Sequence, residues 1–221
     1  MGFVNFGDLR RLEPVSREFG FDRGLPIDRY YIEQFLLAHQ SDIRGRVLEI
    51  GDDAYTRQFG GDRVHIRDVL HVESGNPVAT IVGDLTDADH IPSVLFDCFI
   101  LIQTLHLIFD VPRALQTIYR ILKPGGVLLA TFPGISQTSI DRWEKSWCWS
   151  LTTRSTARLL AEIFPQNHIT VRAYGNVLAA ISFLQGLAVA ELTTDELEAH
   201  DSNCELVLSV RAVKPKSEIH K

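Results

Sequence analysis

The sequence predicts an open α/β fold in which short buried strands alternate with helices. Apolar runs of strand length recur at residues 46–51, 64–66, 80–82, 98–102 and 127–131. Residues 111–122 separate the last two runs and carry a helical pattern, with Ala114, Ile118 and Ile121 on one side. Strands that alternate with helices in this way form a mostly parallel sheet with right-handed crossovers.

The remaining elements lie at the two ends of the chain. Residues 26–39 predict an amphipathic helix ahead of the sheet, because Ile27, Tyr31 and Phe35 recur at helical spacing. After the fifth strand, Thr152 or Ser155 can cap a helix running through residues 157–164. A strand at residues 169–174, an apolar helix at 177–190 and a last strand at 204–213 follow.

No internal repeat, low-complexity tract or linker divides the chain. We therefore expect one domain, with a helical N-terminal cap (residues 1–43), a sheet core (44–213) and a polar tail (214–221). A chain of 221 residues is long enough for one sizeable core but short for two.

The composition favours a small-molecule or protein partner. The formal net charge of −6 argues against a broad electrostatic contact with nucleic acid or an anionic membrane, since both need an excess of Lys and Arg. The three cysteines have no CxxC spacing and no histidine cluster nearby, so we expect no disulfide framework and no metal site. Without a secretory signal or a long apolar segment, we expect a cytoplasmic protein.

Acidic and polar residues recur after the predicted strands. In an open α/β sheet the ligand binds outside the carboxyl ends of the strands, so these residues are the candidates for binding. They are Glu49, Gly51, Asp52 and Asp53 at the first strand, Asp68 at the second, Asp84 and Leu85 at the third, and Gln103 and His106 at the fourth. Asp68 lies 68 − 51 = 17 residues beyond Gly51, near the offset of roughly 20 at which an acid contacts ribose hydroxyls.

Five segments give the sequence its resemblance to class I S-adenosylmethionine-dependent methyltransferases. They are VLEIGDDAYTRQFG, IRDVLHVE, IVGDLTDADHIP, FDCFILIQTLHLIFD and LKPGGVLLATFPG. More narrowly, GLPIDRYYIEQFL, GDDAYTRQFGG and AYGNVLAAISFLQGL resemble bacterial methyltransferases associated with glycosyltransferases in polysaccharide pathways. The resemblance implies a Rossmann-like, seven-stranded sheet whose last strand is antiparallel.

The resemblance also implies S-adenosylmethionine as cofactor and methyl transfer to a small acceptor, with O-methylation of a sugar or related metabolite as the first choice. The strand-end residues named above, together with Tyr30 and Val69, would bind the cofactor. His106 would act as the general base, because the fourth strand of the family ends beside the transferring methyl group. Tyr31 and Arg23 would close over the cofactor carboxylate, and Trp143, Trp147 and Trp149 would form a lid over the acceptor.

The first loop departs from the family pattern, because Gly51 is followed by Asp52 and Asp53 where the family has further glycines. Two carboxylates disfavour a pyrophosphate and hence NAD, whereas they tolerate the cationic S-adenosylmethionine. The same loop leaves open a non-catalytic partner or scaffold, and a non-methylating enzyme that uses the cofactor for its charge is a further alternative. Structural roles also stay open: Glu49 as loop organiser, Asp68 and Asp84 as capping acids, and His106 and the tryptophans as packed side chains.

Overall fold

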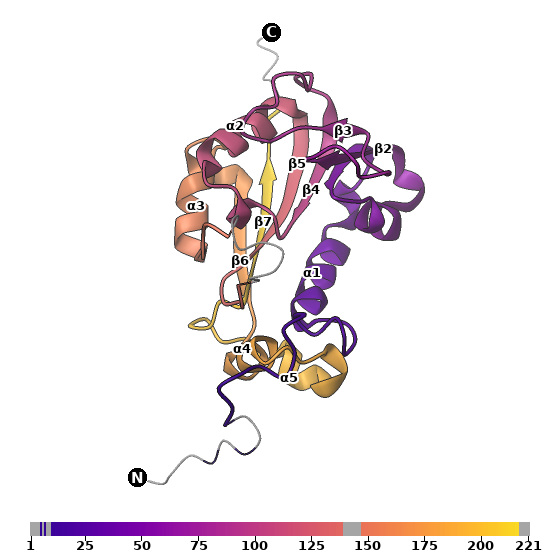
Figure 1. Ribbon diagram of the computed structural model, residues 1–221. Coiled ribbons are helices and arrows are strands. Elements are labelled where there is room, and N and C mark those ends of the chain that lie inside the picture. Colours follow the sequence, from indigo (N-terminus) through magenta and orange to yellow (C-terminus); the bar gives the residue numbers. More distant parts are fainter. Residues whose placement is uncertain (1–4, 6, 8–9, 139–146, 217–221) are drawn as a thin grey trace.

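A computed structural model describes residues 5, 7, 10–138 and 147–216 of the protein. One seven-stranded sheet runs through this part of the chain in the order β3-β2-β1-β4-β5-β7-β6 (Figure 1). The strands are β1 (Gly45–Ile50), β2 (Val64–His71), β3 (Ile81–Val82), β4 (Phe96–Ile102), β5 (Leu122–Pro133), β6 (Ile169–Tyr174) and β7 (Val207–Val213). The first five pair in parallel, and β7 is antiparallel to both of its neighbours. The expected sheet with an antiparallel last strand is confirmed.

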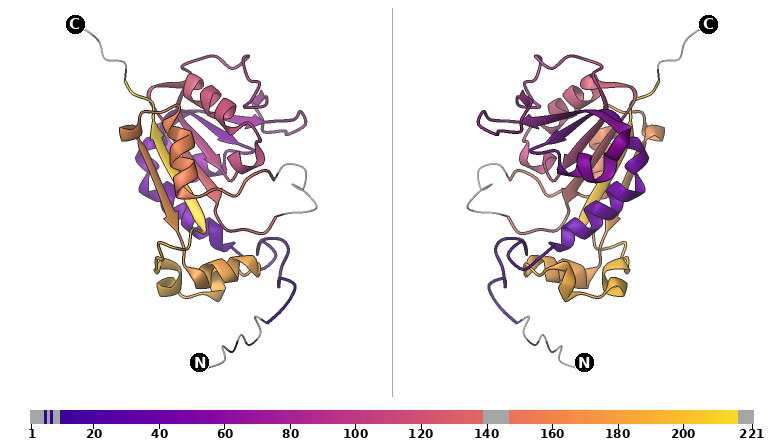
Figure 2. Two further views of the ribbon diagram at one scale, coloured as in Figure 1. Left: turned by 90° about the vertical axis from the view of Figure 1, so that its left-hand side faces the viewer. Right: turned by 90° about the vertical axis from the view of Figure 1, so that its right-hand side faces the viewer.

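Helices cover both faces of this sheet (Figure 2). The helices are α1 (Ile27–Ala38), α2 (Val111–Ile121), α3 (Thr153–Ala161), α4 (Val177–Leu184) and α5 (Thr194–Glu198). One core cluster packs α2 and α3 against alternate strand residues such as Leu48 and Phe99. The other packs α1 and α4 against the opposite face, where Val47 and Ile100 point. The predicted N-terminal helix is therefore present and packs directly on the sheet.

Local sequence signals explain where several elements begin and end. Thr152 caps α3 and Ser155 completes the capping box, so both predicted candidates take part. The side chain of Asp110 caps α2 by accepting a hydrogen bond from the backbone of Arg113. α4 ends at Leu184 rather than at residue 190, because Gly186 takes a positive φ of 71° that stops the helix.

Two strands are longer than their apolar runs. β2 was expected to end at residue 66, but it pairs with β1 as far as Leu70 opposite Ile50, so the polar pair Arg67 and Asp68 lies inside the strand. β5 begins at Leu122, earlier than the expected residue 127. Pairing with a neighbouring strand extends a strand through polar residues that interrupt the hydrophobic pattern.

An N-terminal strap, residues 16–26, crosses the end of the molecule where the parallel strands finish, beside α4 and α5 (Figure 1). The backbone of Ser16 donates to Gln185 over 3.0 Å, and Val189 donates to Leu25 over 2.8 Å. A side chain at Gly186 would place its Cβ 2.3 Å from the Ser16 carbonyl oxygen, so the contact needs glycine. The strap is thereby fixed as a wall over the carboxyl ends of the strands.

Candidate active site

A cleft of about 1260 Å³ lies between the carboxyl ends of the parallel strands and the N-terminal strap. Ligand pockets for small molecules span roughly 300 to 1,000 Å³, so this volume has room for a nucleoside cofactor and a small second ligand together. The strands contribute residues from Ile50 to Asp52, Leu70 to Val72, Gly83 to Thr86 and Ile102 to Thr104. The strap and the start of α1 contribute Arg17, Glu18, Phe19, Phe21, Asp28 and Arg29.

The first loop presents Gly51 and Asp52 to this cleft, as predicted. Gly51 has a φ of 84°, and its backbone N–H donates to the Leu70 carbonyl over 3.0 Å, which anchors the loop to β2. A Cβ built on Gly51 meets no atom within 4 Å, so the backbone there is open to a ligand that approaches closely. Asp52 is exposed and uses one oxygen to accept from Ala54 over 2.9 Å.

The loop after β3 brings Asp84 and Leu85 to the same cleft. Asp84 caps a turn by accepting from the backbone and hydroxyl of Thr86, each over 2.8 Å. The structural role that the sequence left open is thus real, yet it occupies only Oδ1 of this exposed carboxylate. Leu85 is 3% exposed and forms an apolar wall beside it.

Gln103 and His106, which follow β4, also line the cleft. Gln103 has a φ of 48°, a left-handed conformation that is strained for a residue other than glycine and is often found at functional sites. His106 is 3% exposed and packs edge-on against Trp147, with ring centroids 4.5 Å apart. Its Nδ1 has no hydrogen-bond partner among the described residues, and burial lowers the pKa of His106 to about 4.

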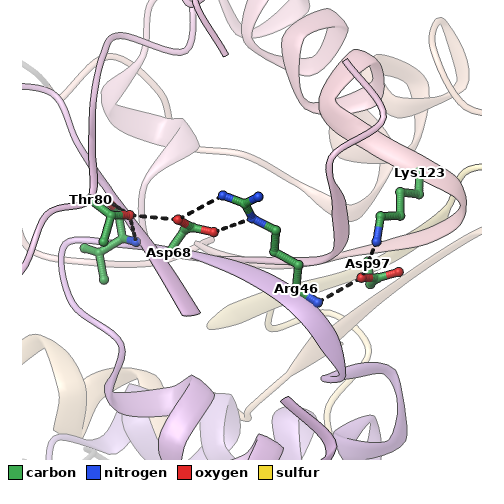
Figure 3. Close-up of polar contacts among 6 residues, drawn as sticks. Arg46, Asp68, Thr80, Asp97 and Lys123 are labelled. Atoms are coloured by element: carbon green, nitrogen blue, oxygen red, sulfur yellow. Dashed lines mark hydrogen bonds and ion pairs between the residues drawn. The ribbon is translucent and has the colours of Figure 1, made fainter. Parts of the chain in front are cut away.

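Asp68 and Val69, which were predicted to bind the cofactor, do not line the cleft and have partners within the sheet instead. Asp68 lies inside β2, where it is 7% exposed. It accepts two hydrogen bonds from the guanidinium of Arg46, over 2.7 and 3.3 Å, and one from the hydroxyl of Thr80 over 3.1 Å (Figure 3). Val69 is 3% exposed and pairs through its backbone with Thr80. The strand continues past its apolar run to His71, which does line the cleft.

Asp53 and Tyr30 also point elsewhere. The carboxylate of Asp53 pairs with Arg57 over 2.8 Å and with Arg67 over 3.1 Å, outside the cleft, and its hydrogen bond from Arg57 holds its pKa below the usual value. Two arginines therefore neutralise one of the two acids that make the first loop unusual. Tyr30 turns its hydroxyl toward Glu198 over 3.3 Å, because the side chains along α1 diverge around the helix axis.

Glu49 organises the first loop and does not line the cleft. It is 3% exposed and accepts from the backbone N–H groups of Tyr55 and Thr56, over 3.1 and 2.7 Å. Burial raises the pKa of Glu49 to about 7, against these hydrogen bonds, which lower it. Of its two proposed roles, the structure shows the loop-organising one.

Of the residues predicted to close over the site, some line the cleft and others lie away from it. Arg23 forms an ion pair with Glu191, and Tyr31 is buried with its hydroxyl donating to Leu197 over 2.8 Å, so neither faces the cleft. Trp147 lines the cleft, whereas Trp149 stacks on Phe109 with centroids 5.6 Å apart. Trp143 lies outside the described residues.

The N-terminal residues of the cleft were missed by the sequence reasoning. Asp28 and Arg29 start an amphipathic helix, and Phe19 and Phe21 belong to the strap ahead of it. Only their place in the folded chain brings them to the strand ends, because the strap docks on residues 184–191, which are about 170 positions away in sequence. No short-range motif marks them.

The part of the chain that the structure describes lacks both a cluster of metal-binding side chains and a membrane-spanning helix. Residues 10–138 and 147–216 contain no group of three His, Cys, Asp or Glu side chains arranged to hold a metal ion. Within those same ranges, none of the helices has the length and apolar character needed to cross a membrane.

The donor set of the cleft fits S-adenosylmethionine. The backbone at Gly51 is open to a ligand that approaches closely. Asp84 and His71 follow the strands at positions where nucleotide-binding sheets bind the polar groups of adenosine. The carboxylates of Asp28 and Asp52 line the cleft and attract a cationic ligand. Bound there, the cofactor supplies an electrophilic methyl group on a sulfonium.

Comparisons with known proteins agree with this geometry. Residues 46–130 match the family described as a methyltransferase domain. No curated protein matches the chain.

Among solved structures, the chain is similar to the SAM-dependent methyltransferase from Thermotoga maritima described as a possible histamine N-methyltransferase, with 16% identity, 90% and 98% of the two chains covered and a TM-score of 0.54. It is also similar to Haemonchus contortus phosphoethanolamine N-methyltransferase 2 in complex with phosphomonomethylethanolamine and S-adenosylhomocysteine, with 15% identity, 97% and 61% of the two chains covered and a TM-score of 0.54. A third similar structure is the (4+2)-cyclase SpnF, with 17% identity, 86% and 82% of the two chains covered and a TM-score of 0.55. These likenesses are of fold, and the sequence match covers the stretch from β1 to β5, which forms the sheet side of the cleft. The match to a methyltransferase domain therefore covers residues 46–130, and the likeness to the solved methyltransferases shows the fold.

Proposed function

We propose that the protein transfers the methyl group of S-adenosylmethionine to a hydroxyl oxygen of a sugar or a related small polar metabolite. The observation that carries the proposal is His106, a buried imidazole in the wall of the cleft whose Nδ1 has no hydrogen-bond partner among the residues that the structure describes. An alcohol is a poor nucleophile near neutral pH, so its methylation benefits from a base held against the hydroxyl.

The reaction is an in-line displacement. A lone pair of the acceptor oxygen forms the new C–O bond as the S–C bond of the sulfonium breaks, and S-adenosylhomocysteine leaves with that electron pair. His106 accepts the hydroxyl proton. The chain otherwise contributes alignment of the two reactants in one cleft, which is the larger source of acceleration for a two-substrate reaction.

The low pKa of His106 has two consequences. With a pKa of about 4, the imidazole is neutral at pH 7 and ready to accept a hydrogen bond. The same burial makes it a weaker base than an exposed histidine, so its contribution should fall near the lower end of the 10²- to 10⁴-fold usual for general acid–base catalysis.

The walls away from the first loop favour a small polar acceptor. Phe19, Phe21 and Trp147 offer apolar faces, while Glu18 and Gln137 offer polar groups beside them. Flat apolar surfaces next to hydrogen-bonding edges suit a sugar ring, which has both. The acids in the cleft and the net charge of −6 disfavour a nucleic-acid acceptor. With this function we also predict a cytoplasmic location and a role like that of the methyltransferases associated with glycosyltransferases.

The open cleft counts against the scaffold alternative, which predicts a filled one. A non-methylating enzyme remains the specific rival, since one structural neighbour is described as a cyclase. Methyl transfer and this rival differ in products, because only methyl transfer converts the cofactor to S-adenosylhomocysteine.

The test uses S-adenosylmethionine with a deuterated methyl group and a panel of sugars and nucleotide sugars, read by mass spectrometry. We expect a deuterated methyl ether in one product class and turnover in His106→Asn reduced by about 10²-fold with the affinity for S-adenosylhomocysteine retained. His168→Asn, remote from the cleft, is the matched control. Normal turnover in His106→Asn, or transfer of the label to nitrogen or carbon acceptors alone, would refute O-methylation with His106 as base.

A further inference from the structure

Asp28 is a buried carboxylate in the wall of the cleft without a complete set of partners. It lies in the first turn of α1 and is 7% exposed. Its Oδ1 has no hydrogen-bond partner among the described residues. Burial raises the pKa of Asp28, and the nearby Arg29 only partly opposes this, at 4.0 Å between Nε and Oδ1.

Its position in a helix does not account for this burial. The helix dipole stabilises a carboxylate in the first turn, but it also stabilises an exposed carboxylate there, which keeps its hydration. A buried oxygen without a donor costs free energy comparable to a lost hydrogen bond. A donor from a ligand in the cleft would satisfy Oδ1.

Arg29 lies next to Asp28 in the same wall. Burial alone would lower the pKa of Arg29, but Asp28, Tyr55 and Glu33 together keep it above its usual value. The guanidinium carbon also lies 5.6 Å from the centre of the Phe21 ring. Gly51 and Asp52 of the first loop line the same cleft as this pair of opposite charges.

The pair therefore matches a ligand group that carries both an ammonium and a carboxylate. S-adenosylmethionine has one such group, its amino-acid end. A typical sugar acceptor has none, so the pair distinguishes the two ligands of the cleft.

We propose that Asp28 and Arg29 bind the amino-acid end of the cofactor, with Asp28 accepting from the ammonium and Arg29 donating to the carboxylate. The first loop then contacts the cofactor mainly through Gly51 and needs fewer glycines than the family pattern has. The charge of Asp53, which Arg57 and Arg67 neutralise, is not required for binding.

The test compares two ligands by calorimetry. S-adenosylhomocysteine has the amino-acid end, and 5′-methylthioadenosine lacks it. We expect Asp28→Asn to weaken S-adenosylhomocysteine by about 10- to 100-fold, the usual range for a lost charge-assisted hydrogen bond, and to leave methylthioadenosine unchanged. Arg29→Gln should give the same pattern. Asp62→Asn, which changes an exposed acid outside the cleft, should change the affinity for neither ligand.

A stability measurement separates this role from a structural one. Because the folded protein pays to bury the charge of Asp28, Asp28→Asn should melt at the same or a higher temperature in the absence of ligand. A structural carboxylate would show a lower melting temperature instead.

Equal losses for both ligands, or unchanged binding of S-adenosylhomocysteine, would overturn the proposal. Unchanged binding together with a raised KM for the methyl acceptor would assign Asp28 to the acceptor. Neither result bears on whether the acceptor atom is oxygen, which the labelled-methyl experiment decides separately.

Discussion

Replacing Asp68 by Asn should destabilise the fold and leave cofactor binding intact. The carboxylate is 7% exposed and accepts a bidentate pair from Arg46, over 2.7 and 3.3 Å, and a third bond from Thr80 over 3.1 Å. An amide keeps the shape but places an N–H₂ donor where one of these acceptors stood. The loss is therefore one or two hydrogen bonds to a charged group, with Arg46 left without its counter-charge.

The magnitude follows from the exposure of the two partners. Each charged hydrogen bond contributes about 1.5 to 3 kcal/mol. The Arg46 side chain is 31% exposed, so water recovers part of the loss. We expect a decrease of about 2 to 3 kcal/mol in the free energy of unfolding. At about 2 to 4 °C per kcal/mol for a chain of this size, the melting temperature should fall by about 4 to 12 °C.

The assay is urea denaturation of the two proteins, combined with calorimetric titration of S-adenosylhomocysteine well below both melting temperatures. Lys123→Met is the matched control, because it removes the neighbouring ion pair with Asp97, whose side chains are 39% and 33% exposed (Figure 3). This more exposed pair should contribute no more than about 1 kcal/mol. An Asp68→Asn variant of normal stability that binds S-adenosylhomocysteine tenfold more weakly would refute the reasoning and restore the ribose assignment.

Three further predictions concern the cleft and its supports. S-adenosylmethionine and S-adenosylhomocysteine should each stabilise the protein by about 2.7 kcal/mol at 100 times their Kd. NAD should not shift the melting temperature, because the carboxylates of Asp52 and Asp84 in the cleft repel a pyrophosphate. Gly186→Ala should lower the free energy of unfolding by about 2 to 4 kcal/mol and weaken the binding of S-adenosylhomocysteine. The φ of 71° at this position is unfavourable for alanine, and the added Cβ would displace the strap at Ser16. A normal urea midpoint would argue against a fixed strap. Glu49→Gln should flatten the pH dependence of stability. The pKa of Glu49 is raised from 4.5 to about 7, so the free energy of unfolding of the wild type should fall by up to about 3 kcal/mol as the pH rises from below 4.5 through 7. An equal slope of stability against pH in both proteins would contradict this.

The sheet was predictable because its signals are local. Of the parallel strands, β1, β4 and β5 each contain apolar residues that are buried on both faces, and α2 and α3 carry their capping residues in sequence. The antiparallel place of β7 came from the family resemblance. The strand ends were less predictable, because pairing with β1 extends β2 through polar residues whose side chains find partners in Arg46 and Thr80.

The cleft was predictable only on its sheet side. Gly51, Asp52, Asp84, Leu85, Gln103 and His106 lie where strand-end reasoning placed them. Asp28 and Arg29 come from the opposite wall, which the strap builds through contacts between segments about 170 residues apart. Periodicity showed that residues 26–39 form a helix, but it does not show which residues of that helix meet the strand ends.

Asp68 shows that spacing alone does not bring a residue to the cleft, and the strand register gives a better guide. The backbone of Gly51 bonds to Leu70, so the register of β1 and β2 makes Leu70 the residue level with the first loop. His71, at 71 − 51 = 20 residues from Gly51, then matches the expected offset of roughly 20 more closely than Asp68 at 17. The nearest acid in sequence attracted the assignment because carboxylates bind ribose hydroxyls, but a carboxylate three residues short of the strand end points into the sheet's own ion pairs. Register relative to the glycine turn is therefore a better guide than residue type when a loop of this class departs from its family pattern.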